Sequence, residues 1–148
     1  MLSGKARYAL KALLYLAANP NRSVLIAEIA TAHMIPRKFL DAIMLDLKNT
    51  GVLVSKRGKG GGYRLARPPE RIVIGAVLRA LDGPFAPLAC ASRSAYQPCE
   101  DCTNVDLCPI RLLMLRVRDA ISGVLDTTTL SDFSKLPSNI TPFLMYDI

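Results

Sequence analysis

Four cysteines lie within a nineteen-residue stretch of the chain: Cys90, Cys99, Cys102 and Cys108. Thiolates at this density are suitable ligands for a zinc ion or an iron–sulfur cluster. Cys99 and Cys102 are two residues apart, so both can reach one metal centre. Zinc ribbons usually contain two such close pairs, and this chain has one. Zinc, an iron–sulfur cluster and a metal-free thiol or disulfide switch therefore all stay open.

The charge of the chain is unevenly distributed. Residues 1–71 contain thirteen Lys or Arg and four Asp or Glu, a net charge of +9, whereas residues 72–148 contain six and eight, a net charge of −2. A basic half of this kind is typical of a protein that binds a polyanion such as DNA. A basic surface that serves only solubility is the alternative. A chain of 148 residues fits one domain, or one small domain with an appendage.

The cellular compartment follows from hydropathy and from the cysteines. No apolar run approaches the ~18 uncharged residues of a membrane span. Lys11 interrupts the apolar stretch near the N-terminus, which makes a signal peptide a poor interpretation. We expect a cytoplasmic protein with no membrane partner, in which thiols stay reduced and clustered cysteines indicate metal or redox chemistry.

The basic half contains a helix-turn-helix pattern. Helical periodicity predicts helices over residues 3–18, with Ser3 as N-cap, about 24–33, and about 36–50, opened by Pro36. Two short helices joined by a tight turn are typical of DNA-binding domains. The only histidine, His33, lies in the turn and is interpreted as a turn or surface residue rather than a ligand. In the second helix, Leu25, Ile26, Ile29 and Ala30 are expected to face inward. The third helix carries the apolar residues Phe39, Leu40, Ile43, Met44 and Leu47.

A glycine-rich hairpin follows these helices. Residues 52–55 and 63–66 have the composition of two strands, and the intervening segment is KRGKGGG. Its glycines permit close approach to a phosphate backbone, and Lys56, Arg57 and Lys59 supply positive charge. A nucleotide-binding loop is the rival interpretation, but the Walker spacing is absent and no helix directly follows. The hairpin is therefore predicted to be the wing of a winged helix.

The acidic half is predicted to contain a short helix over about 74–82, the cysteine loop over 84–108, and a long helix from Pro109 to about Leu125. The apolar stripe of the long helix suggests a dimer interface, with some packing on its own domain. The residues of this predicted interface are Ile110, Leu113, Met114, Val117, Ile121 and Val124. The tail has no assigned role, although its apolar segment 143–146 suggests a docking surface or an exposed end.

These predictions combine into a mainly α fold with a small β-hairpin wing. We expect a winged helix-turn-helix domain at 1–83, a cysteine-rich cluster-binding loop at 84–108, and a dimerisation helix with a short C-terminal element at 109–133. Residues 134–148 form the tail. Cys108 is expected at the N-cap of the long helix, where the positive end of the helix dipole lowers the pKa of its thiol.

The segment RGKGGGYRLA, the preceding helix-turn-helix, and a cysteine loop leading into a long helix together resemble one family. It is the family of IscR/NsrR-type winged-helix transcriptional regulators that carry iron–sulfur clusters, and the resemblance covers residues 1 to about 133. It implies a homodimer that binds a palindromic DNA operator and senses iron, redox state or nitric oxide. It also implies that the third helix enters the major groove and that the wing, through Arg57 and its glycines, enters the minor groove. The DNA-binding residues implied are Pro36, Arg37, Lys38, Asp41, Lys56, Arg57, Gly58, Lys59, Gly60 and Gly61.

The cysteine pattern departs from the usual form of that family, which has three cysteines in the loop. Cys102 and Cys108 keep the family's spacing, but Cys90 and Cys99 both lie upstream. The histidine of IscR-like members is replaced by Arg111, which cannot ligate metal. The aspartate of NsrR-like members has no counterpart near Arg7. We infer an all-cysteine site within one subunit, holding a [2Fe–2S] or [4Fe–4S] cluster, with zinc as the alternative.

The predicted function is therefore that of a homodimeric, sequence-specific transcriptional regulator, a repressor or an activator, whose operator affinity is switched by an iron–sulfur cluster. A zinc-stabilised or thiol-switched DNA-binding module is the first alternative. A redox or electron-transfer protein is the second, and in it the basic wing has no role. We expect no enzyme, because the sequence lacks a nucleophile–base pair or a metal-hydrolase motif.

Overall fold

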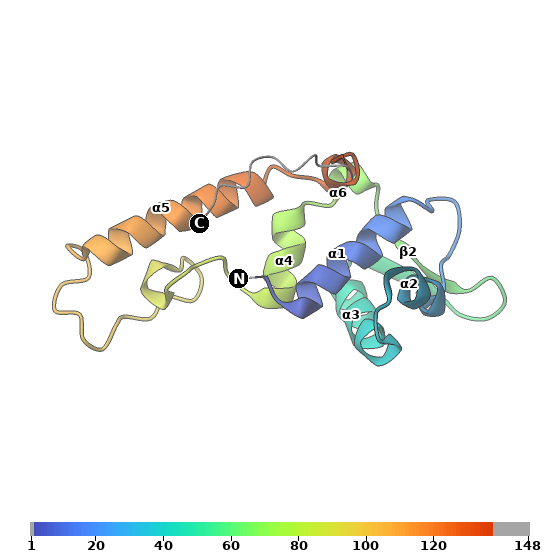
Figure 1. Cartoon of the computed structure of the whole chain (residues 1–148), viewed down its shortest axis with the longest axis horizontal. Coiled ribbons are helices and arrows are strands. Elements are labelled where there is room, and N and C mark those ends of the chain that lie inside the picture. The colour runs from blue at the N-terminus through green and yellow to red at the C-terminus, as the bar shows by residue number, and fades with distance from the viewer. Residues whose placement is uncertain (1, 138–148) are drawn as a thin grey trace, which may run out of the picture.

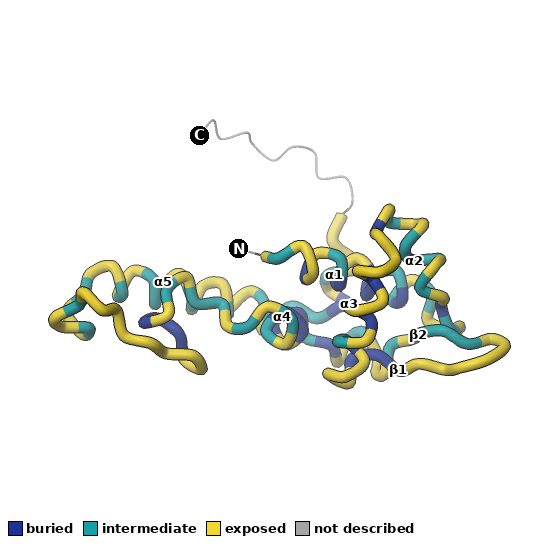
Figure 2. The backbone as a smooth tube through the Cα atoms, turned by 90° about the horizontal axis from the view of Figure 1, so that it is seen from below, coloured by how far each residue is buried: buried dark blue, intermediate teal, exposed yellow. Residues whose placement is uncertain are grey.

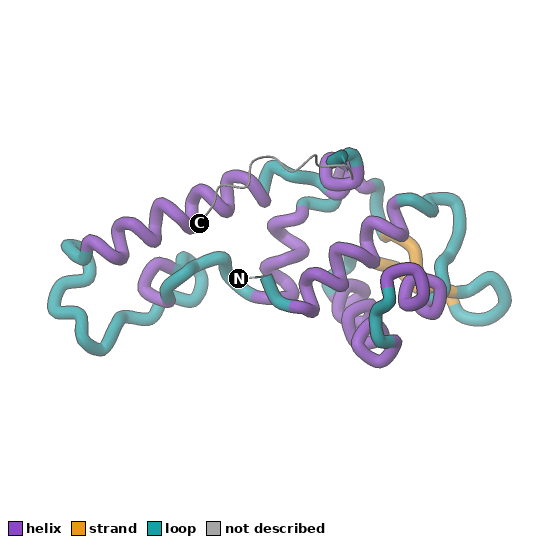
Figure 3. The backbone as a smooth tube through the Cα atoms, viewed as in Figure 1, coloured by secondary structure: helices purple, strands orange, loops and turns teal. Residues whose placement is uncertain are grey.

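A computed structural model describes residues 2–137 and confirms a mainly helical fold with one β-hairpin (Figures 1 and 3). The predicted apolar segment of the tail, residues 143–146, lies outside the described residues. A compact body holds the N-terminal helices and the hairpin, and the longest helix extends away from it as an arm (Figure 1). The elements in chain order are α1 (Gly4–Ala17), α2 (Ile26–His33), α3 (Arg37–Asn49), β1 (Leu53–Lys56), β2 (Gly62–Leu65), η1 (Pro69–Arg71), α4 (Ile74–Asp82), η2 (Ala89–Ala91), α5 (Pro109–Leu125) and α6 (Leu130–Ser134).

Helix α1 is the central helix of the body and contacts α3, α4, α6 and β2. Its N-cap is Ser3, as predicted, and the Ser3 hydroxyl accepts a hydrogen bond from the Ala6 amide at 3.0 Å. Small side chains on the buried face let neighbouring helices approach closely. That face consists of Ala6, Ala9, Ala12, Leu13 and Leu16.

The start of α2 differs from the prediction. Val24 is extended and exchanges two hydrogen bonds of 2.8 Å with Tyr63 of the hairpin, so the helix begins only at Ile26. This pairing leaves Leu25 54% exposed, and its predicted inward orientation was wrong. The turn after α2 is closed by Met34 in the left-handed conformation, with φ of 51°.

Helix α3 starts immediately after Pro36 and buries one narrow stripe, made of Leu40, Ile43, Met44 and Leu47. Phe39, another apolar residue of this helix, is outside the stripe and 65% exposed. At 100° per residue Phe39 lies about a quarter turn away from the centre of the stripe, on the flank of the helix. The exposed remainder of α3 is therefore free for another role.

The wing is an antiparallel hairpin in which Leu53 pairs with Leu65 and Lys56 with Gly62. Its tip needs glycine, because Gly58 and Gly60 adopt φ of +84° and +71°. At the base, a Cβ on Gly62 would lie 2.5 Å from the carbonyl oxygen of Val24. Glycine at that position lets the chain before α2 pack directly against the hairpin.

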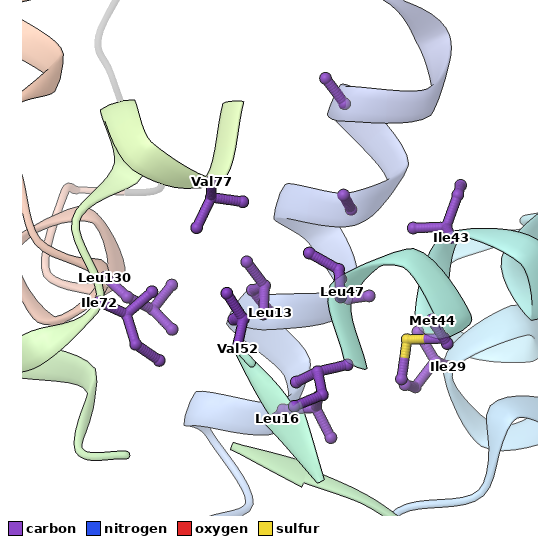
Figure 4. Packing of buried hydrophobic residues seen from close by; sticks show 14 of the residues in the cluster. Leu13, Leu16, Ile29, Ile43, Met44, Leu47, Val52, Ile72, Val77 and Leu130 are labelled. Carbon is purple, nitrogen blue, oxygen red and sulfur yellow. The ribbon is translucent and has the colours of Figure 1, made fainter. Parts of the chain in front are cut away.

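The hydrophobic core joins all parts of the body, including the C-terminal element (Figure 4). Leu130, the first residue of α6, is fully buried and its amide donates to the carbonyl of Ile72 at 2.7 Å. The side chain of Thr129 caps α6, and Thr128 accepts from the Ile74 amide at 2.9 Å. The chain therefore returns from the arm to complete the core of the N-terminal body.

Helix α5 is attached to the body mainly through α4. The guanidinium of Arg79 donates two hydrogen bonds of 2.6 Å to the carboxylate of Asp126, immediately after α5. This ion pair lowers the pKa of Asp126. Gly75 of α4 lies against Asp126, where a larger side chain would collide with the carboxylate. Within residues 2–137, no helix has both the length and the apolar character needed to cross a membrane.

Candidate DNA-binding surface and cysteine loop

The outward face of α3 presents a row of side chains for a ligand. All four residues predicted to contact DNA at the start of this helix are exposed: Pro36, Arg37, Lys38 and Asp41. Directly opposite the buried stripe, the exposed midline consists of Lys38, Ala42, Leu45 and Asn49. Leu45 is 51% exposed. The analysis of the sequence missed Ala42 and Leu45, although their spacing opposite the apolar stripe was a usable signal.

The wing carries cations that no acidic side chain of residues 2–137 neutralises. Lys56, Arg57 and Lys59 are exposed, as are Gly58 and Gly60. Among the described residues, no carboxylate lies within 4.0 Å of the charged groups of these side chains, of Arg37 or Lys38, or of Arg64 on β2. Unpaired charges on a rigid hairpin and on an adjacent helix produce a positive surface, which is suited to phosphate groups.

His33 proves to be a packing residue at the end of α2. Its ring meets that of Tyr15 edge to face, with centroids 5.8 Å apart, and its Nε2 atom is buried without a hydrogen-bond partner. The prediction that His33 is not a metal ligand stays untested, but the residue is more buried than a simple surface position.

The cysteine loop lies beside the far half of α5 (Figures 1 and 2). Cys90 is 3% exposed in η2, Cys99 is exposed, and Cys102 and Cys108 are half-buried. Cys99 lies near both Cys90 and Cys102, and Cys102 lies near Cys108. Within residues 2–137, no three His, Cys, Asp or Glu side chains converge on one metal-binding point. The four-cysteine site remains a prediction, with all four thiols in the one loop beside α5.

The acidity of the thiols differs along the loop. The pKa of Cys108 is lowered, chiefly by the backbone amides of Arg111 and Ile110 at the start of α5. Cys108 is the N-cap residue with Pro109 next, which agrees with the prediction. The pKa of Cys99 is raised, chiefly by the Cys90 thiol, and partial burial raises the pKa of Cys102. Cys108 is therefore the thiol best prepared to bind a metal as thiolate.

Two arginines of α5 bind the backbone of the cysteine loop. Arg111 donates from Nε to the Cys90 carbonyl at 3.0 Å, and Arg118 donates from Nη1 to the Ala91 carbonyl at 2.6 Å. The two arginines lie seven residues apart, so they project from one face of the helix. Charged donors of this kind make strong hydrogen bonds. The position of η2 is consequently tied to that of α5, which the sequence did not reveal.

A second face of α5, about 100° around the helix from Arg111 and Arg118, is apolar and uncovered. Five of the six predicted interface residues, all except the half-buried Met114, are between 37% and 65% exposed, and no residue of α5 is fully buried (Figure 2). A smaller side of the helix, which includes Leu115 and Leu125, is half-buried against its own chain. An apolar stripe of this length on a protruding helix is typical of a surface that another molecule covers.

Three comparisons relate the chain to known proteins. A family model named Rrf2, described as an iron-dependent transcriptional regulator, matches residues 2–135. A Rhodobacter capsulatus protein described as an rrf2-like HTH-type transcriptional regulator is 45% identical over 136 residues, covering 89% of this chain and 91% of the relative. The structure of CymR, the global cysteine regulator of B. subtilis, matches with a TM-score of 0.74 and 32% identity, over 90% of this chain and 95% of CymR. The structure of T. potens IscR matches with a TM-score of 0.71 and 27% identity, over 90% of this chain and 85% of IscR.

Proposed function

Because this chain belongs to the Rrf2 family of transcriptional regulators, we propose that it binds operator DNA as a homodimer and that its cysteine loop controls this binding. The membership confirms the resemblance inferred from the wing, the helix-turn-helix and the cysteine loop. It also makes the protein a regulator rather than an enzyme. The single observation that supports DNA binding most strongly is the surface of unpaired cations shared by α3 and the wing.

In the proposed complex, α3 enters the major groove and the wing lies over the adjacent minor groove. The start of α3, with Arg37 and Lys38, contacts base edges and phosphates. Arg57 follows the hairpin's first strand at a tip of exposed glycines, and an arginine in this setting suits a narrow, strongly negative minor groove. A symmetric dimer would place two such units on a palindromic site in the cytoplasm.

Base readout by α3 should include thymine, because Ala42 and Leu45 on its exposed midline can contact only apolar groups. We expect that replacing one thymine with uracil in each half-site of a selected operator weakens binding about threefold to tenfold, since only a methyl group is removed. Fluorescence anisotropy with a series of uracil-substituted duplexes measures this effect. The Leu45→Ala variant should bind equally well to duplexes with thymine and with uracil at the operator position that Leu45 contacts. Equal affinity at every substituted position would show that this face reads no thymine.

The proposed dimer uses the uncovered face of α5. We expect that Val117→Glu, at the centre of the apolar stripe, converts the dimer into monomers, because a buried unpaired carboxylate is costly in such an interface. Light scattering after size-exclusion chromatography at fixed concentration measures the change. Arg116→Glu places the same side chain on α5 outside the stripe and should leave the dimer intact. A Val117→Glu protein that stays dimeric would rule out this helix face as the interface.

The loop provides the right donors for a thiolate-bound group. Four thiols in one loop, one of them with a lowered pKa, suit either an iron–sulfur cluster or zinc. We propose that Cys90, Cys99, Cys102 and Cys108 hold an iron–sulfur cluster. The resemblance implies the cluster, and the all-cysteine ligand set is inferred from this chain's own residues. When bound, the cluster would supply sensitivity to iron, redox state or nitric oxide.

The residues around the loop offer a physical connection from the cysteines to the DNA-binding elements. Arg111 and Arg118 bind the backbone of η2, so a change in the loop would bear directly on α5. The Arg79–Asp126 ion pair joins the other end of α5 to α4 and hence to the body. We propose that a rearranged loop tilts α5 and changes the separation of the two α3 helices. Half-sites about one DNA turn apart tolerate little change in that separation.

Anaerobic purification followed by metal analysis tests the proposed cofactor. We expect visible absorbance together with matched amounts of iron and acid-labile sulfide, and loss of both in Cys102→Ser. Operator binding measured before and after exposure to air would then show whether the cluster controls affinity. Colourless protein with one zinc per chain would instead make the cysteines a structural site.

A metal-free dithiol switch is the second candidate, and the closeness of Cys90 to Cys99 and of Cys102 to Cys108 favours it. Oxidised glutathione would convert each pair to a disulfide by exchange, releasing two reduced glutathione molecules for every disulfide formed. Peptide mapping of metal-free, oxidised protein would then find the bonds Cys90–Cys99 and Cys102–Cys108. A matched iron and sulfide content in the anaerobic sample would argue against this candidate.

A further inference from the structure

A polar groove lies between the α1–α2 connection and the outer face of the wing. Its volume is about 680 Å³. The α1–α2 connection runs beside the hairpin in Figure 1, and the same two segments form the walls of the groove. The lining residues come from two segments and include no carboxylate: Pro20, Asn21, Arg22 and Ser23 on one wall, and Val54, Ser55, Lys56, Gly60 and Arg64 on the other.

The register of the hairpin places two cations together on the groove side. Val54 pairs directly with Arg64, and Lys56 is two residues beyond Val54 on the same strand. Because side chains alternate between the faces of a strand, Lys56 and Arg64 are diagonal neighbours on one face of the hairpin. The alternate residues, including Leu53 and Tyr63, belong to the core on the other face.

The two walls of the groove form one rigid unit. The Val24 amide donates to the Tyr63 carbonyl and the Tyr63 amide donates to the Val24 carbonyl, both at 2.8 Å. The close packing of Gly62 on Val24 prevents a gap at the base. A ligand that enters the groove therefore meets side chains whose backbone is already ordered, which reduces the entropic cost of binding.

The charges in the groove are unequally available. Arg22 is held by Glu28 at 2.7 Å and by the Asn19 side-chain oxygen at 3.1 Å, so its charge is partly neutralised. Lys56 and Arg64 have no carboxylate partner within 4.0 Å among the described residues. Ser23 adds a hydroxyl donor on the facing wall, whereas Ser55 pairs with Tyr63 on the other face of the hairpin. The groove therefore combines two free cations with a neutral donor, a set that suits a phosphate oxygen.

We infer that this groove seats a backbone phosphate of the operator duplex, with Arg64 and Lys56 as its cationic ligands and Ser23 as a hydroxyl donor. The inference rests on the proposed DNA-binding function and adds a contact outside the recognition helix and the wing tip. A phosphodiester backbone fits because the groove is open, positively charged and continuous at Lys56 with the basic tip of the wing. A contact of this type fixes the wing on the duplex and carries no base specificity.

The experiment compares Arg64→Ala with Arg71→Ala, an exposed arginine of η1 that does not line the groove. Anisotropy titrations on operator and non-operator duplexes are repeated over a range of salt concentrations. We expect Arg64→Ala to weaken binding to both duplexes by on the order of tenfold and to reduce the slope of log affinity against log salt by about 0.9 per lost contact. Arg71→Ala should behave as wild type, and thermal unfolding should be unchanged in both variants.

Operators carrying one neutral methylphosphonate at a time locate the contact. Wild-type protein should bind more weakly when the methylphosphonate is at one flanking position of each half-site. The affinity of Arg64→Ala should be the same with and without the methylphosphonate at that position.

Three outcomes would overturn the inference. The first is an Arg64→Ala slope equal to that of Arg71→Ala while Arg57→Ala is impaired, which would leave the proposed function intact. The second concerns inorganic phosphate, whose binding to the wild-type protein is measured by calorimetry. If Arg64→Ala abolished this binding but left DNA affinity unchanged, the groove would be a site for a small anion. The third, wild-type protein without salt-dependent DNA binding, would overturn the proposed function itself.

Discussion

Replacing Arg57 with alanine is expected to weaken operator binding by about tenfold to a hundredfold, because one minor-groove contact is lost from each half-site. The side chain is exposed on the wing and no carboxylate within the described part of the chain competes for it. Arg57→Lys should recover only part of the affinity, since lysine keeps the charge but lacks the planar fork of donors.

Titration of operator DNA by anisotropy at physiological ionic strength measures this effect. Arg71→Ala on η1 is the matched control, because it removes the same charge from a position away from the wing. The loss in Arg57→Ala should be larger on operators with an A·T-rich minor groove than on G·C-rich variants, since the narrow groove concentrates negative potential. Unchanged binding at physiological salt would mean that the wing does not contact the minor groove as proposed.

The second large effect concerns stability. Leu130→Ala is expected to lower the free energy of unfolding by about 2–5 kcal/mol, because it leaves a cavity in a fully buried position of the core. Leu130 joins α6 to the same cluster as Leu13 and Ile72, although more than fifty residues separate it from Ile72 along the chain. The measurement is urea denaturation followed by circular dichroism at one fixed protein concentration, since the proposed dimerisation would also contribute to stability.

Leu136→Ala provides the control for this stability prediction. Leu136 lies close to Leu130 along the chain and is 61% exposed, so its truncation should change the free energy of unfolding by less than about 0.5 kcal/mol. If Leu130→Ala were as mild as this control, α6 would not belong to the core of the body. The C-terminal element would then be separate from the winged helix-turn-helix domain, as in the predicted division of the chain into residues 1–83 and 109–133.

Local patterns in the sequence determined most of the secondary structure. Helix α5 begins at Pro109 and ends at Leu125, as predicted, because proline at the first turn and an unbroken helical periodicity act within a few residues. The basic glycine tip of the wing was equally readable, since its backbone conformation depends on glycine itself. The cysteines were singled out by their residue type alone. The N-cap role of Cys108 also depended only on its neighbours.

Tertiary structure decided which faces are covered and which side chains meet. Leu25 and Phe39 follow helical periodicity, yet both are exposed, because Val24 pairs with the hairpin and α3 buries only one narrow stripe. Periodicity places a residue on one face of a helix, but it does not determine how much of that face a neighbouring element covers. The return of α6 to the core likewise depends on contacts between segments that are distant in sequence.

The arrangement of the cysteine loop also required the tertiary structure. Arg111 and Arg118 of α5 hold loop residues that are twenty-one and twenty-seven positions away along the chain. No periodicity constrains such a loop, so its path is determined by the hydrogen bonds that satisfy its backbone against α5. The sequence by itself therefore determined which side chains are available to the proposed sites, and the packing of distant segments decided how those side chains are connected.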